Sequence, residues 1–321
     1  MLKRIVKRTL TSVLIILVVS IALIGYSFVP TRLDVKAYHS SDTFQSPADT
    51  ASLPEVALSV IECGRMKSRQ SFVFLGGSWA EDYFSGMAAV LIRHPKATML
   101  FDTGFGANVD EHIKSIPMLM RALTTYDKET NAARQLQEHG IAPDQIDRII
   151  LSHWHWDHVS GAEDFPGVEV MLSKAEEDNI QTLSASELIS RMRGRLKLCS
   201  FDFTSGAYEN FDRSFDIFSD GSLVLVPLPG HTPGSTGLFV NLRSGKRFFF
   251  IGDLTWAIEG VRLPAERPWI SRKLVDLDEE QVRRSIIKVH QLHERRPDLI
   301  VVPAHDRRIH DQIANFPEVE R

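Results

Sequence analysis

The sequence predicts an α/β protein in which two β-sheets are covered by helices. Short apolar runs end in polar or turn residues, amphipathic segments separate groups of these runs, and the composition is globular, with 43% hydrophobic and 24% charged residues. Because the strands come in sequential groups, two sheets with helices outside them are expected. The predicted strands are 56–63, 88–94, 98–104, 147–153, 168–172, 223–231, 247–253 and 298–305.

The clearest predicted helix covers residues 278–296, "DEEQVRRSIIKVHQLHERR". Val282, Ile286, Val289 and Leu292 follow helical spacing, so they are expected to share one apolar face. Acidic residues at the start of this segment favour a helix N-terminus, because the helix dipole is positive there.

Residues 1–29 predict a membrane anchor. Twenty residues without a charge, 10–29, follow the basic residues Lys3, Arg4, Lys7 and Arg8. At 1.5 Å per residue, such a helix spans a hydrocarbon core of about 30 Å. The basic residues are expected to stay in the cytoplasm, which places the rest of the chain outside, in the periplasm or extracellular space. A cleaved signal peptide and a secreted protein are the alternative, although no clear small-residue cleavage site is present.

Residues 30–54, rich in Ser, Thr, Asp and Pro, predict a linker, and residues 55–321 predict one folded domain. Without the four N-terminal basic residues, 33 basic and 41 acidic residues remain, so nucleic acid is not an expected partner. Cys63 and Cys199 are expected to be unpaired thiols.

The segment "LSHWHWDHVSG", 151–161, predicts a metal site, because imidazole nitrogens and carboxylate oxygens suit zinc and related divalent ions. On an extended backbone, His153, His155 and Asp157 point to one side, and His158 joins Asp157 if the chain turns there. Four potential ligands exceed what one ion usually takes from a single segment. Two adjacent ions are therefore expected.

Distant side chains are needed to complete the shells of two ions. His231, Asp253 and His305 each end an apolar run, in "PLPGH", "FFIGD" and "VVPAH", and Asp102 does so in "LFDTG". Strand ends hold functional groups on a rigid scaffold, so these residues are expected to converge on one rim.

Five motifs in this order resemble the metallo-β-lactamase superfamily, closest in motif set to acyl-homoserine lactonase-like members. They are "FDTG" at 101–104, "HWHWDH" at 153–158, "GHTPGS" at 230–235, "GD" at 252–253 and "PAH" at 303–305. The resemblance implies an αβ/βα four-layer sandwich, the metallo-β-lactamase fold, with the metals at one edge.

The resemblance also implies seven ligands for two divalent metal ions, with zinc as the first choice. One ion would be held by His153, His155 and His231, and the other by Asp157, His158 and His305, with Asp253 as the bridge. Asp102 would orient a ligand histidine.

The implied reaction is hydrolysis, in which a metal-bridging hydroxide attacks an ester or lactone carbonyl. Asp157 and Asp253 would be the catalytic residues, and Asp157 would relay a proton to the leaving group. The alternatives are a thioesterase or phosphotriesterase of the same fold, or a non-catalytic metal-binding protein.

The expected partner is a small-molecule substrate with an apolar portion. Trp154, Trp156 and Trp256 predict either aromatic walls of the site or core packing, and residues 104–129 predict an apolar lid or core. Zinc β-lactamases commonly carry cysteine at the position of Asp253, which argues against penicillin-type substrates. Lactonases usually carry tyrosine where this chain has Trp256, a departure from the lactonase pattern.

Overall fold

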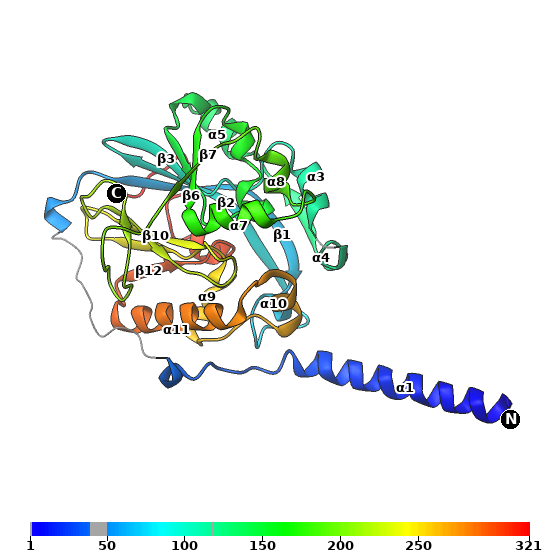
Figure 1. The fold of residues 1–321 in the computed structure, drawn as a ribbon. Helices are drawn as coiled ribbons and strands as arrows, with labels where there is room; N and C mark the ends of the chain where they lie inside the picture. The colour runs from blue at the N-terminus through cyan, green and yellow to red at the C-terminus, as the bar shows by residue number, and fades with distance from the viewer. Residues whose placement is uncertain (1, 39–49, 117) are drawn as a thin grey trace.

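Two β-sheets pack face to face, with helices on their outer sides (Figure 1). The computed structural model describes residues 2–38, 50–116 and 118–321. The first sheet contains, in spatial order, β4 (Thr125–Lys128), β1 (Ala57–Arg69), β2 (Asp82–His94), β3 (Ala97–Phe101), β5 (Arg148–Ile150), β6 (Glu169–Ser173) and β7 (Lys197–Phe201). The second contains β12 (Leu299–Val302), β11 (Arg247–Phe250), β10 (Thr236–Asn241), β9 (Leu223–Pro227) and β8 (Phe215–Asp216). The predicted mixed α/β sandwich is confirmed.

Each predicted strand overlaps an observed one, but the sheets contain more strands than predicted. The strands β4, β7, β8 and β10 were not predicted, and β1 and β2 extend well beyond their predicted ends. In β10 every residue is buried, because it lies between β9 and β11. Its sequence therefore lacks the polar–apolar alternation that marks a half-exposed strand.

The central strands of the first sheet bury both faces. Val60, Ile92 and Phe101 belong to the core between the sheets. Their neighbours along the chain, Ile61 and Leu91, pack on the other face, as the two-residue period of a strand requires. That outer face is covered by α5 (Ala132–Glu138), α7 (Lys174–Thr182) and α8 (Leu188–Met192).

The long helix α11 (Glu279–Arg295) packs along the second sheet (Figure 1). The predicted helix is confirmed, with Asp278 as the N-cap whose side chain accepts a hydrogen bond from Gln281 N at 3.0 Å. The predicted apolar residues are buried against the sheet core. The shorter helices are α2 (Gln70–Val73), α3 (Val109–His112), α4 (Met118–Leu123), α6 (Trp156–Val159), α9 (Ile258–Arg262), α10 (Trp269–Val275) and α12 (Arg307–His310).

The N-terminal helix α1 (Leu2–Tyr26) projects away from the sandwich (Figure 1). Its segment Val6–Tyr26 is long and apolar enough to cross a membrane, and its apolar part is not buried against the rest of the protein. A signal sequence can have the same length and composition. The helix α1 is therefore a candidate for a membrane anchor or for a signal sequence. The predicted linker falls partly on residues 39–49, which lie outside the described residues. Cys63 is buried, Cys199 is half-buried, and both are free thiols, as expected.

The stacked rings of Phe239 and Phe249 allow a test of the core. Their centroids lie 3.8 Å apart with an interplanar angle of 4°, and both rings are fully buried. Phe239→Ala leaves a cavity, so we expect the free energy of unfolding to fall by about 3–5 kcal/mol in chemical denaturation. The control Phe84→Ala, at a side chain that is 39% exposed, should change it by less than about 1 kcal/mol. Equal losses in the two variants would contradict this packing.

Candidate metal centre

The ends of five strands gather the predicted site residues at one end of the sandwich. In the first sheet β3 runs parallel to β5, and in the second β11 runs parallel to β12. Parallel neighbours end at the same edge, so the residues after them lie close together. The residues that follow these strands are Asp102, His153, Asp253 and His305, and His231 follows β9.

The structure brings six of the predicted ligands into two clusters of three. Within each cluster the potential ligand atoms lie within 4.8 Å of one another, and the clusters are His153, His155 and His231, and Asp157, His158 and His305. In the first cluster, His155 Nδ1 lies 3.0 Å from His153 Nε2 and 2.8 Å from His231 Nε2. In the second, His305 Nε2 lies 3.4 Å from Asp157 Oδ2.

Asp253 lies between the two clusters, with one carboxylate oxygen toward each. Its Oδ1 lies 3.1 Å from His158 Nε2 and 2.9 Å from His305 Nε2. Its Oδ2 lies 3.4 Å from His231 Nε2. All seven side chains singled out from the sequence therefore lie together.

The local backbone differs from the predicted one. An extended segment was expected through Asp157, but α6 begins at Trp156, with His155 as its N-cap. Asp157 therefore lies on the first turn beside His158, and the side chains of His153 and His155 form the other cluster. The turn therefore places one half of the motif in each cluster.

The donor set fits a pair of divalent ions. His158 Nε2 and Asp253 Oδ1 are buried and make no hydrogen bond within the part of the chain described. Such atoms are costly unless a ligand satisfies them. Burial, reinforced by the neighbouring histidines, holds the pKa of His153 and of His155 well below the usual range. These imidazoles are therefore neutral, the form that coordinates a metal.

Asp102 orients His158 from the side away from the cluster. Its Oδ2 lies 2.8 Å from His158 Nδ1, and its two oxygens accept hydrogen bonds from Ser152 N and Ser152 Oγ, both at 2.7 Å. Burial alone would lower the pKa of His158, but the carboxylates of Asp102 and Asp253 raise it well above the usual range. Asp102 adopts a φ of 54°, which is uncommon for a residue with a side chain. The expected orienting role fits this geometry.

Asp276 and Arg267 support the other cluster and were not predicted. Asp276 Oδ1 lies 2.8 Å from His231 Nδ1 and accepts a hydrogen bond from Arg267 Nη1 at 2.8 Å. The Arg267 guanidinium also donates to the backbone carbonyl of Asp253. Asp276 is 45 positions from His231, in the loop before α11, and no motif surrounds it. Only the folded chain reveals this pairing.

The family model for the metallo-beta-lactamase superfamily matches residues 86–305, a range that contains the whole site. The chain belongs to the metallo-beta-lactamase superfamily. The probable metallo-hydrolase Rv2300c of Mycobacterium tuberculosis is 28% identical over 234 residues, 68% of this chain and 73% of that protein. The N-acyl homoserine lactonase AttM of Agrobacterium fabrum is 24% identical over 276 residues, 82% of this chain and 97% of that protein.

Solved structures of this superfamily share the fold. An N-acyl homoserine lactone hydrolase with N-hexanoyl-L-homoserine at its catalytic metal centre superposes with a TM-score of 0.67 at 18% identity, covering 84% of this chain and all of that one. The dizinc quorum-quenching lactonase AidC gives a TM-score of 0.54 at 18% identity, over 83% and 90% of the two chains. The resemblance to lactonase-like members is confirmed, and the relatives support a metal-dependent hydrolase.

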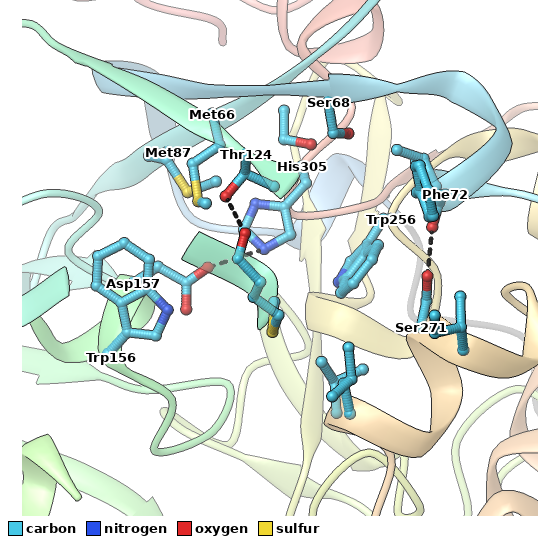
Figure 2. Close-up of a pocket in the computed structure, with 16 residues that line it drawn as sticks. Met66, Ser68, Phe72, Met87, Thr124, Trp156, Asp157, Trp256, Ser271 and His305 are labelled. Carbon is cyan, nitrogen blue, oxygen red and sulfur yellow. Dashed lines mark hydrogen bonds and ion pairs between the residues drawn. The ribbon is translucent and has the colours of Figure 1, made fainter. Parts of the chain in front are cut away.

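An apolar pocket opens onto the metallo-beta-lactamase site (Figure 2). Asp157 and His305 line the pocket, whose cavity volume is about 100 Å³. Apolar side chains make most of the remaining wall, among them Met66, Met87, Met120, Trp156, Trp256 and Leu274. The pocket therefore suits a substrate with an apolar portion next to the reacting group.

The three tryptophans of the motifs have different places. Trp156 and Trp256 line the pocket (Figure 2), whereas Trp154 is buried in the outer core and donates from Nε1 to Asn179 Oδ1 at 2.9 Å. Trp256 Nε1 donates to Asp253 Oδ2 at 2.7 Å. Of the predicted lid, Met120 reaches the pocket wall and Ile116 packs in the core. For the tryptophans, both the wall and the core interpretations are therefore partly right.

The Glu176 side chain connects the loop that carries His153 and His155 to the loop that carries His231. It accepts hydrogen bonds from Trp154 N at 2.8 Å and Gly234 N at 2.9 Å, and from Thr232 Oγ1. Burial raises the pKa of its carboxyl to about 7, although these three donors oppose the rise. The pKa in the unfolded chain is about 4.5, so the folded state loses stability as the pH rises from about 4.5 to about 7.

Comparison with Glu176→Gln isolates this titration, because all other groups titrate alike in both proteins. We expect the unfolding free energy of the wild type, relative to that of the variant, to fall by about 3 kcal/mol between pH 4.5 and pH 8. Urea denaturation at several pH values measures the difference. A difference that is constant with pH would contradict the raised pKa.

Proposed function

We propose that the protein is a dinuclear metal-dependent hydrolase of esters or lactones, lactonase-like in its chemistry. The observation that carries the proposal is the pair of three-residue clusters with Asp253 between them, of which Asp157 and His305 line an apolar pocket. The N-acyl homoserine lactonases among the relatives support it.

The proposed ligands are the seven predicted side chains. One divalent ion, with zinc as the first choice, would be held by His153, His155 and His231, the other by Asp157, His158 and His305, and Asp253 would serve both. When bound, such ions supply Lewis acidity and a nucleophilic water near neutral pH.

The protein's own groups would hold the geometry and move the proton. The Asp157 carboxylate lies at the pocket wall (Figure 2), where it can pass a proton to the leaving group. Trp156 and Trp256 line the same pocket and would hold the apolar part of the substrate. The hydrogen bond from Trp256 and the contact from Arg267 fix Asp253 in one orientation. A fixed carboxylate needs no reorganisation during the reaction.

We also propose that residues 1–29 anchor the protein in a membrane, with 30–54 as linker and the hydrolase domain, 55–321, outside the cytoplasm. The exposed apolar helix α1 and the basic residues before it support this arrangement. Cleavage and secretion remain the alternative.

Removal of a single ligand tests the site. His155→Ala and Asp253→Ala should each prevent loading of two ions per chain and lower hydrolysis of lactones by at least about 100-fold. Metal content by elemental analysis, and turnover of lactones, esters, thioesters and phosphotriesters, are the measurements. His139→Ala, at an exposed histidine far from the motifs, is the matched control and should change neither. Full loading and activity in either ligand variant would overturn the proposal.

Reversible metal removal separates catalysis from metal storage. A chelator should abolish turnover, and two equivalents of zinc should restore it, because the ligands stay on a folded scaffold without the ions. Restored metal content without turnover of any substrate in the panel would instead indicate a metal-binding protein.

A further inference from the structure

Large apolar side chains are exposed around the outer rim of the pocket. The exposed fractions are 77% for Met118, 56% for Trp79, 48% for Trp269 and 47% for Leu119. These four residues, the apolar rim, do not line the pocket themselves. Three of them lie next to a residue that does: Met120 follows Leu119, Ile270 follows Trp269, and the Phe72 ring lies 5.7 Å from the Trp79 ring. Met118 precedes Leu119 in α4. Grouped exposure of this kind marks an interaction surface.

The chain just after the N-terminal helix α1 packs against Trp79 of this rim. Phe28, two residues beyond α1, places its ring 4.3 Å from that of Trp79 and 5.5 Å from that of Phe72. The last turns of α1 and Trp269 line one groove, which also contains Val29 and Leu75 on its apolar part and Glu266, Arg267, Arg272 and Arg283 on its charged part. Aromatic side chains at the end of an apolar helix are typical of the membrane–water interface.

Two backbone contacts fix this arrangement to the domain. Leu33 N donates to Pro264 O at 2.8 Å, which holds the chain after α1 against the body. Ser271 Oγ donates to Phe72 O at 2.8 Å, which joins α10 to α2 (Figure 2). A bilayer crossed by α1 would therefore meet the domain at one side, and Figure 1 shows α4 projecting toward the side on which α1 extends.

We propose that the apolar rim rests on the lipid bilayer, so that an amphiphilic acyl lactone or ester enters the pocket from the membrane. This inference rests on the proposed function for its chemistry and on α1 as the anchor for its geometry. The rim residues border the apolar wall of the pocket, and Asp157 and His305 line the same pocket. An acyl chain leaving the bilayer would thus stay in apolar surroundings until its polar end reaches Asp157 and His305.

The bilayer is favoured over a second copy of the chain because the rim is continuous with the apolar helix. Any protein that covered Trp79 and Trp269 would have to fit beside α1 and Phe28. A fluid bilayer already surrounds that helix and needs no matching shape. An interface between two copies is the competing outcome of the test.

Tryptophan fluorescence of the full chain in phosphatidylcholine vesicles tests the surface without any substrate. Lipids brominated near the headgroup end of the acyl chains quench tryptophans within contact distance. We expect clear quenching in the wild type and its loss in the Trp79→Phe/Trp269→Phe double variant. The matched control Trp154→Phe removes a core tryptophan and should leave the quenching in place. Absent quenching in the wild type, or equal quenching in the double variant, would overturn the proposal, as would a dimer that shields both tryptophans.

Hydrolysis in the same vesicles tests the route of the substrate. For the Met118→Glu/Leu119→Glu variant we expect the turnover of a long-chain γ-lactone, relative to a short-chain one, to fall about tenfold, because the carboxylates repel the rim from lipid. The matched control is Arg243→Glu/Ser244→Glu, at exposed residues beside the C-terminus, and it should keep the wild-type ratio. An unchanged ratio in the first variant would contradict the route. If no lactone of either length is hydrolysed, the proposed chemistry fails, and the quenching still decides the membrane contact.

Discussion

The position of Asp253 between two clusters of histidine and aspartate is the constraint on which the site depends. Its two oxygens face opposite clusters, so the second sheet, which carries Asp253 at the end of β11, must stay in register with the first, which carries His153 and His158. The apolar core between the sheets supplies that register. A well-packed core transmits small displacements. A change in the packing between the sheets would therefore also change the geometry of the site.

Groups that do not line the pocket hold the histidines of the site in place and balance the buried charges around them. Asp102 supports His158, Asp276 supports His231, and the backbone carbonyl of Gly86 lies 2.8 Å from His305 Nδ1. Arg267 compensates Asp276 and stacks over the Trp256 ring at 4.5 Å. Through Trp256 and its own contact to the Asp253 backbone, Arg267 connects both clusters. Buried charges are tolerated here because every one of these supporting groups has a partner of opposite charge or a hydrogen-bond donor.

The sequence singles out seven side chains that the fold brings together, because residues of these types stand out in the HWHWDH motif and after apolar runs. It predicts the supporting residues poorly. Asp276, Arg267 and Glu176 act across long sequence separations from loops and a helix without any repeating pattern, so only the folded chain shows their partners. Strand β10 was not predicted because its apolar run, 238–240, is only three residues long. The early turn at Trp156 was not predicted because a ligand motif does not encode its own backbone angles. Trp154 packs in the outer core and Trp156, the first residue of α6, lines the pocket. Their sequence context alone does not distinguish the two positions.

The central claim is that the two clusters hold two neighbouring ions. Anomalous X-ray diffraction from crystals of the zinc-loaded protein, recorded on both sides of the zinc absorption edge, tests it most directly. The account predicts two anomalous peaks per chain about 3.5–4 Å apart, one beside His153, His155 and His231 and one beside Asp157, His158 and His305, with Asp253 touching both. A single peak, or peaks located away from these side chains, would contradict it.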